Sequence, residues 1–334
     1  MIINLHGYRI HCDAPSEELQ TKLVRPFQLF LHEGNVADIA ITVRNQVPPY
    51  REFPTLEASF STPRNVVYDR GDIKLVDYFG KGATVEDKSR ASFTLYGTDD
   101  NFLQEAFYLL VLSIFGQYCD NNGMLRVHAM AVSYGDKAFI MPIPSGGGKS
   151  TMALAMLEEK GFKLISDDEP VVARDGSILP FALRMGTLDK TRLATIPDEY
   201  IYSIDRMEFG VKHFIDARYW EAQLEQRALT DTIYLAATRV LNGEASITPV
   251  PKYKVFKSLL RDAILGVGLY QGLEFMLGHS PFTTISKVGT VVRRSVVALK
   301  LLRNTTTYRF VLSDDIDENR RILKAFAQSQ TSQG

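Results

Sequence analysis

One short segment of the 334-residue sequence combines residue types that bind phosphate. It reads Ser145, Gly146, Gly147, Gly148, Lys149, Ser150, Thr151. Glycines let successive backbone N–H groups approach an anion with no Cβ in the way, and the positive end of a following helix adds to the same field. The ammonium group of Lys149 would reach the terminal phosphates of a nucleotide, and the hydroxyl of Ser150 would bind Mg²⁺. The segment therefore predicts a site for ATP and magnesium.

The segment departs at one position from the P-loop pattern G-x-x-x-x-G-K-[ST]. Ile143 stands where the first glycine is expected, between Pro142 and Pro144, which would stiffen the start of the loop. An alternative interpretation is a flexible turn before an ordinary helix. The apolar strand predicted before the segment and the helix predicted after it favour nucleotide binding.

Two adjacent carboxylates, Asp167 and Asp168, follow the strand predicted over residues 162–166. A crossover through the helix would make this strand parallel to the one before the glycines, so both strands would end at the same edge of the sheet. Phosphoryl transfer needs one carboxylate to bind Mg²⁺ and another to take the proton from the attacking hydroxyl, and the pair could divide these roles in either order. The alternative is a solvated acidic turn that Glu169 continues.

His128 is placed at the mouth of the loop by the geometry of a predicted hairpin. Residues 126–134 and 137–143 are predicted as two strands joined by a two-residue turn at 135–136. Counting back from that turn sets His128 opposite Ile143. A neutral imidazole there could approach the terminal phosphate or hydrogen-bond a loop carbonyl. The alternative is a structural histidine, which is what we expect for the other five histidines.

Three basic residues, Arg184, Lys190 and Arg192, follow a second predicted hairpin. They could neutralise a transferred phosphate or hold an acidic substrate. The alternative for each of them is a solvated surface position.

The elements that must position these residues divide the α/β chain into four parts. Residues 1–98 are predicted as a β-rich module and residues 99–123 as a buried connecting helix. Residues 124–328 are predicted as the domain that carries the candidate site, and residues 329–334 as a frayed polar tail.

Local patterns support this division. In the module, apolar and polar residues alternate in 37–43, 73–76 and 91–96, which predicts strands, and turn signals separate these segments. In the domain we expect a helix at 152–160, a hairpin of 170–174 with 177–181, helices at 253–278, 288–302 and 318–328, and a strand at 307–312.

Composition and charge exclude several classes of protein. Hydrophobic residues make up 45% of the chain and charged residues 23%, which excludes collagen, coiled coil and wholesale disorder. The 38 basic and 39 acidic side chains give a net charge of −1, so there is no global basic field for nucleic acid. Two distant cysteines, Cys12 and Cys119, do not make a disulfide framework and favour a cytoplasmic setting. We find no signal peptide, and the most apolar window, 102–115, is about 14 residues, too short to span a bilayer.

Residues 126–181, about a sixth of the chain, resemble the catalytic domain of HPr kinase/phosphorylase and its relatives, which include kinases that phosphorylate a serine on lasso-peptide precursors. The resemblance rests on residues 128–132, on the glycine-rich segment and on residues 161–168. It implies a P-loop kinase core related to HPr kinase and phosphoenolpyruvate carboxykinase, and Mg²⁺-dependent transfer from ATP to a serine hydroxyl. It also implies that His128, Asp167 and Asp168, which match the histidine and acidic pair of the family, line the active site together with Lys149.

Two features depart from the family pattern. Ile143 replaces the first glycine of the loop, and the chain lacks the Glu-x-Arg-Gly-x-Gly segment that is linked in HPr kinases to the reverse phosphorylase reaction. These departures indicate a divergent branch rather than a regulator of HPr.

The sequence thus predicts a cytoplasmic kinase that phosphorylates a serine of a peptide or protein, with a ribosomally made, lasso-type precursor as the narrower expectation. Two alternatives stay open: a kinase of a small alcohol such as free serine, and a non-catalytic nucleotide-binding module. We expect neither nucleic acid nor a membrane as partner, and the oligomeric state stays open, a homo-oligomer included.

Overall fold

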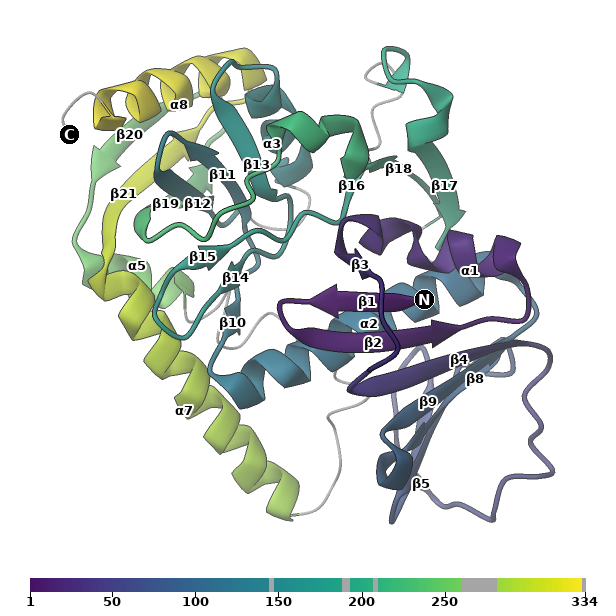
Figure 1. Cartoon of the computed structure of the whole chain (residues 1–334). Helices are drawn as coiled ribbons and strands as arrows, with labels where there is room; N and C mark the ends of the chain where they lie inside the picture. The colour runs from purple at the N-terminus through teal and green to yellow at the C-terminus, as the bar shows by residue number, and fades with distance from the viewer. Residues whose placement is uncertain (144–146, 188–192, 207–209, 260–280, 332–334) are drawn as a thin grey trace. The chain divides into compact units, whose positions relative to one another are not determined.

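The computed structural model describes residues 1–143, 147–187, 193–206, 210–259 and 281–331 (Figure 1). It is a mixed α/β structure, as the sequence predicts at that level. Contacts divide the chain into two units, each taken here in its described part. Unit 1 comprises Met1–Tyr118, Leu188–Arg218 and Gly268–Val288, and unit 2 comprises Cys119–Thr187, Tyr219–Val267 and Gly289–Gly334. The contiguous division expected from the sequence differs from these units, because two later segments group with the N-terminal one.

Unit 1 is built on one nine-stranded sheet, in agreement with the β-rich module predicted for residues 1–98. Buried and half-exposed residues alternate along β9 (Ser92–Gly97), where Phe93 and Leu95 are buried. The strand order is β3 (Leu31–His32), β1 (Ile2–Leu5), β2 (Tyr8–Asp13), β4 (Ile39–Asn45), β9 (Ser92–Gly97), β8 (Gly82–Asp87), β7 (Ile73–Asp77), β6 (Val66–Arg70), β5 (Ala58–Ser61). The unit also contains helix α1 (Glu17–Val24) and the antiparallel pair β17 (Ile201–Asp205) and β18 (Val211–Asp216).

Helix α2 (Asp100–Asn122) is the predicted connecting helix, and it is longer than its apolar window. Its first residues pack closely on the sheet, because a Cβ placed on Gly82 would lie only 2.2 Å from a ring carbon of Phe102. Among the described residues, α2 is the one helix long and apolar enough to cross a membrane by length and composition. The prediction that this apolar segment is too short to span a bilayer is therefore wrong by length and composition. However, 61% of the apolar window of α2 is buried inside the protein, and the buried core helix of a soluble protein passes the same test.

Unit 2 contains a six-stranded sheet that carries the candidate site. Its order is β13 (Phe162–Ser166), β11 (Met130–Tyr134), β12 (Lys137–Met141), β19 (Asp231–Arg239), β21 (Thr305–Leu312), β20 (Ser246–Pro249). The β11–β12 hairpin pairs Tyr134 with Lys137, which confirms the predicted turn. A three-stranded sheet of β10 (Leu125–Arg126), β14 (Val171–Val172) and β15 (Ile178–Leu179) contains the second predicted hairpin.

Helices cover both faces of the six-stranded sheet (Figure 1). On one face lie α3 (Lys149–Leu157) and α8 (Ile316–Thr331), whose Phe326 ring packs edge-on against Phe139 of β12. On the other face lie α5 (Lys252–Leu259) and α7 (Pro281–Arg303), whose Leu259 and Leu301 share a buried core with Ile140. Phe139 and Ile140 are neighbours on one strand and therefore point to opposite faces. The sheet is thus the middle of three layers.

Several predicted bounds need correction. The strand expected at 126–134 begins only at Met130, because Leu125 and Arg126 pair in the smaller sheet instead. The tail expected at 329–334 is helical as far as Thr331, because α8 continues beyond its last buried residue, Ala327. The helices expected near 288–302 and 318–328 and the strand near 307–312 are confirmed as α7, α8 and β21. Of the helix expected at 253–278, only α5 is described, and residues 260–278 lie outside the described part of the chain.

Both cysteines are free and buried. Burial raises the pKa of the Cys12 thiol and of the Cys119 thiol to about 12. At neutral pH both are therefore protonated and behave as small apolar core residues.

Candidate functional site

Three segments of unit 2 meet at one edge of the six-stranded sheet. Strands β12 and β13 are each antiparallel to β11, which lies between them, so they are parallel to each other. Their carboxyl ends therefore share one edge, as predicted, and β11 begins at that same edge. The segment after β12 leads into α3, the segment after β13 holds the acidic pair, and the segment before β11 holds His128.

Lys149 is the first residue of α3, and its side chain is buried. Gly148 precedes it with a φ of +94°, a left-handed conformation that a side chain would strain. Lys149 Nζ donates a hydrogen bond to the carbonyl oxygen of Ile143 at 3.0 Å. The same Nζ lies 2.9 Å from Nε2 of His128 and 3.5 Å from Oδ1 of Asp168. The lysine thus contacts all three segments.

His128 bridges Lys149 and Asp168. Its Nδ1 lies 3.4 Å from Oδ1 of Asp168, while its Nε2 faces the ammonium group. Nε2 can accept a hydrogen bond from the ammonium group when the ring carries its proton on Nδ1, the nitrogen that faces the carboxylate. The side chains of His128 and Asp168 are 31% and 45% exposed, whereas that of Lys149 is 8% exposed. Solvent therefore reaches the cluster from the His128–Asp168 side.

Arg126 and Glu169 form a buried ion pair beside this cluster, and sequence reasoning missed both. Their nearest side-chain atoms are 3.0 Å apart, and the side chains are only 4% and 6% exposed. Burial raises the pKa of the Glu169 carboxyl group, and Arg126 opposes that rise. The interpretation as a solvated acidic turn is therefore wrong for Glu169, and also for Asp167, which is buried. Sequence offered one signal: a basic residue two positions before His128 and an acidic residue after Asp168.

A β-bulge lies in β13 just before the acidic pair. Ala131 and Val132 of β11 pair with Ser166 and Leu164, so Ile165 is an extra residue in β13. A bulge bends its strand, and here it does so immediately before the two aspartates. The backbone N–H of Ala129 then donates to the carbonyl oxygen of Asp168 at 3.0 Å. Backbone pairing therefore fixes Asp168 against the His128 segment.

The other residues predicted from the sequence have varied positions. Helix α3 begins three residues earlier than predicted, so its first turn includes Ser150, which is half-buried, and Thr151, which is exposed. Gly147, which precedes Gly148, is half-buried. Arg184 is buried in β16 (Arg184–Thr187), so a solvated surface position is wrong for it. Four predicted residues lie outside the described part of the chain: Ser145, Gly146, Lys190 and Arg192.

The donor set suits a nucleotide phosphate accompanied by a divalent cation. Two adjacent carboxylates, the buried Asp167 and the half-exposed Asp168, follow β13 at this edge, and Ser150 lies in the first turn of α3. Carboxylate oxygens are the protein donors that Mg²⁺ prefers. A left-handed Gly148 followed by a helical Lys149 orients successive N–H groups as an anion-binding nest, and the N-terminus of α3 adds positive potential. The residues present therefore fit both groups.

The chain has no match among protein-family models and none among curated proteins.

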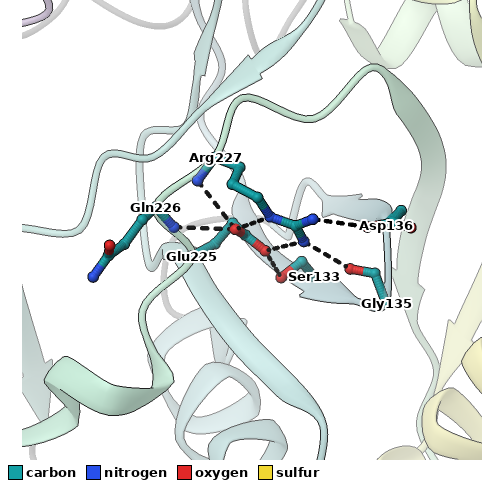
Figure 2. A network of polar contacts seen from close by, with 6 residues as sticks. All are labelled: Ser133, Gly135, Asp136, Glu225, Gln226 and Arg227. Atoms are coloured by element: carbon teal, nitrogen blue, oxygen red, sulfur yellow. Dashed lines mark hydrogen bonds and ion pairs between the residues drawn. The ribbon is translucent and has the colours of Figure 1, made fainter.

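A second polar network stabilises the opposite end of the β11–β12 hairpin (Figure 2). The buried carboxylate of Glu225 accepts hydrogen bonds from the Ser133 hydroxyl at 2.9 Å and from Nε of Arg227 at 3.1 Å. Arg227 also donates to Asp136 and to the carbonyl oxygen of Gly135 in the turn. Burial raises the pKa of Glu225, but hydrogen bonds from Arg227 and Ser133 outweigh it and hold that pKa below its ordinary value. The network therefore fixes the hairpin whose other end carries the candidate site.

We expect Glu225→Gln to lower the free energy of unfolding by about 1–3 kcal/mol near pH 7, because the amide cannot accept all the hydrogen bonds of the carboxylate. A depressed carboxyl pKa stabilises the fold above the unfolded-state pKa, and this stabilisation is lost as the pH falls through the folded-state value. The difference between wild type and variant should therefore shrink toward about pH 3. Urea titrations at both pH values measure it. Glu221→Gln, at an exposed position four residues earlier, is the control and should change little at either pH. A difference independent of pH would contradict the role of the charged carboxylate.

Proposed function

We propose that this chain is a P-loop kinase that uses ATP and Mg²⁺ to phosphorylate a serine hydroxyl of a peptide or protein. One observation carries the proposal: Lys149, which begins the helix after the glycine-rich segment, lies within 3.5 Å of both His128 and Asp168. A phosphate-directed lysine beside a carboxylate that can take a proton is the pairing that phosphoryl transfer needs. A module that only binds nucleotide has no need of the carboxylate.

The proposed roles follow from burial and position. Lys149 and the backbone N–H groups at the start of α3 hold the phosphates, while Ser150 and Asp167 bind the cation. The cation supplies neutralisation of charge on the transferred group. Asp168, which is half-exposed, takes the proton of the serine hydroxyl. At the same time the serine oxygen forms a bond to the γ-phosphorus, and the bond between that phosphorus and the leaving ADP breaks. The Nδ1–H of His128 faces Asp168 and holds its carboxylate in place.

The edge of the sheet next to the site constrains how a peptide acceptor would bind. The carbonyl oxygens of Leu164 and Ile165 in β13 already accept hydrogen bonds from the backbone N–H groups of Glu225 and Phe181, at 2.8 and 2.7 Å. A peptide therefore would not add as a further strand at these two residues. We propose that the acceptor serine instead approaches the exposed side of the His128–Asp168 pair.

The resemblance to the HPr kinase family supports the same reaction, and two free, buried cysteines are compatible with the proposed cytoplasmic location. Neither bears on the identity of the acceptor.

The test is transfer of label from γ-labelled ATP with Mg²⁺ to a pool of serine-containing peptides and, in parallel, to free serine. Label on peptides that is lost when their serines are replaced by alanine is the expected result. Label on free serine alone would overturn the peptide acceptor in favour of a small-molecule kinase. Tight ATP binding with no transfer to either acceptor and no hydrolysis would favour the nucleotide-binding module.

A further inference from the structure

The cluster at the candidate site holds more charged groups than the proposed reaction uses. Three are basic or proton-bearing, Arg126, His128 and Lys149, and two are the carboxylates of Asp168 and Glu169. Each carboxylate has its own partners: Glu169 pairs with Arg126, and Asp168 with His128 and Lys149. A cluster this close could be paired differently, so some feature must select this arrangement.

We propose that Arg126 is a positioning residue that reserves Asp168 for His128 and Lys149 by occupying Glu169. This inference rests on the proposed function and names a further residue of that site. Arg126 itself does not face the acceptor, because its side chain is 4% exposed and its guanidinium group is 3.0 Å from Glu169.

Backbone pairing explains why Arg126 lies beside Glu169 at the buried end of the cluster. Arg126 pairs with Val171, and the N–H of Val127 donates to the carbonyl oxygen of Pro170 at 3.1 Å. The same antiparallel register continues to Ala131, which pairs with Ser166. The two segments that carry the cluster therefore run side by side, and Arg126 and Glu169 occupy its buried end while His128 and Asp168 occupy its exposed end.

Without Arg126, the buried carboxyl group of Glu169 needs another hydrogen-bond partner, because a buried polar group without one is costly whether it is charged or has taken up a proton. Its nearest alternatives are the groups of the site, because ligand atoms of Glu169, His128 and Asp168 lie within 4.8 Å of one another. We therefore expect Glu169 in Arg126→Met to compete with Asp168 for His128. Removing Glu169 as well, in Arg126→Met/Glu169→Met, removes the competitor and should return His128 to Asp168, since a buried pair can often be replaced by apolar residues without loss of stability.

The experiment records the imidazole ¹⁵N resonances of His128, identified by their loss in His128→Asn, and kcat for phosphate transfer in the same proteins. In Arg126→Met the His128 resonances should move and kcat should fall by about 10- to 100-fold, with ATP affinity nearly unchanged. In the double variant both should return close to wild type. The matched control is Arg294→Met, which breaks an equally buried pair between Arg294 and Asp120 in the same unit, with contacts of 2.6 and 2.7 Å. This control should leave the His128 resonances in place.

Unmoved His128 resonances in Arg126→Met would overturn the proposal, as would an equal movement in Arg294→Met or the lack of a return in the double variant. If Arg126→Met does not fold, Glu169→Gln replaces it, because the unpaired guanidinium group must then turn to Asp168 and again move the His128 resonances. A wild-type protein that transfers no phosphate, but whose His128 resonances follow the expected pattern, would refute the kinase and leave the positioning role supported.

Discussion

Lys149→Ala should reduce phosphate transfer by about 10³-fold or more, one of the two largest effects expected of a single substitution in this chain. The Nζ of Lys149 contacts the loop carbonyl of Ile143, the ring of His128 and the carboxylate of Asp168. Its removal takes away the positive charge that would face the terminal phosphates and breaks the link among the three segments. Label transfer under saturating ATP, with ATP affinity measured separately by calorimetry, checks the prediction.

Lys163→Ala is the matched control for this variant. Lys163 is exposed on β13, in the same sheet, and it should retain full transfer and ATP affinity. A circular dichroism melt of both variants separates loss of function from loss of fold. Transfer at the wild-type rate by a folded Lys149→Ala protein would show that the glycine-rich segment does not serve the phosphates, and the central inference from the sequence would then be wrong.

Much of the fold of unit 2 could be predicted from local signals. The turn at Gly135 and Asp136, strand β13 and the hairpin at Asp175 and Gly176 each follow from a few adjacent residues, and the structure contains all three. The two-residue turn at Gly135 and Asp136 fixes the register of β11 and β12, as predicted. The second hairpin instead closes over three residues, 174–176, with Ala173 opposite Ser177, so its register differs by one residue from that of a two-residue turn. The common edge of β12 and β13 also follows, since a helical crossover makes its two strands parallel.

The rest depends on contacts between residues far apart in the sequence. The position of β11 between β12 and β13 is a choice of strand order, which no local pattern encodes. Arg126 and Glu169 are separated by more than forty residues, and only the fold shows that both are buried and paired. A charged residue in a polar-looking turn is ordinarily read as solvated, because burial of a charge is costly unless a partner is present. The partner is what the sequence could not reveal.

The same limit applies to the two aspartates, which the sequence treats alike. The structure separates them: Asp167 is 7% exposed, whereas the side chain of Asp168 is 45% exposed and faces His128 and Lys149. A group that takes a proton from an acceptor must be reachable by that acceptor. Under the proposed function, this difference in exposure favours Asp168 over Asp167 for proton abstraction and leads to the second prediction.

Asp168→Asn should lower kcat for transfer by about 10²- to 10⁴-fold while leaving the affinity for ATP within a few-fold of wild type. The amide keeps the shape of the side chain but cannot take the proton of the serine hydroxyl. Because Asp168 is half-exposed and its carbonyl oxygen, not its side chain, bonds to Ala129, the fold should survive. Initial rates at several acceptor concentrations separate the effect on kcat from the effect on KM.

The control is Asp136→Asn, in the exposed turn at the opposite end of the β11–β12 hairpin, where the side chain is 87% exposed and pairs with the half-exposed Arg227. It should transfer phosphate at the wild-type rate. If Asp168→Asn keeps kcat and Asp167→Asn loses it, the two roles are reversed, and the buried carboxylate must then be reached through a rearrangement of the segment after β13. If neither substitution changes kcat, the acidic pair has no part in proton transfer. The carboxylate beside Lys149 then no longer supports a kinase over a nucleotide-binding module. Both carboxylates lie in one short segment, so these two variants together decide whether the chemistry of the site is catalytic.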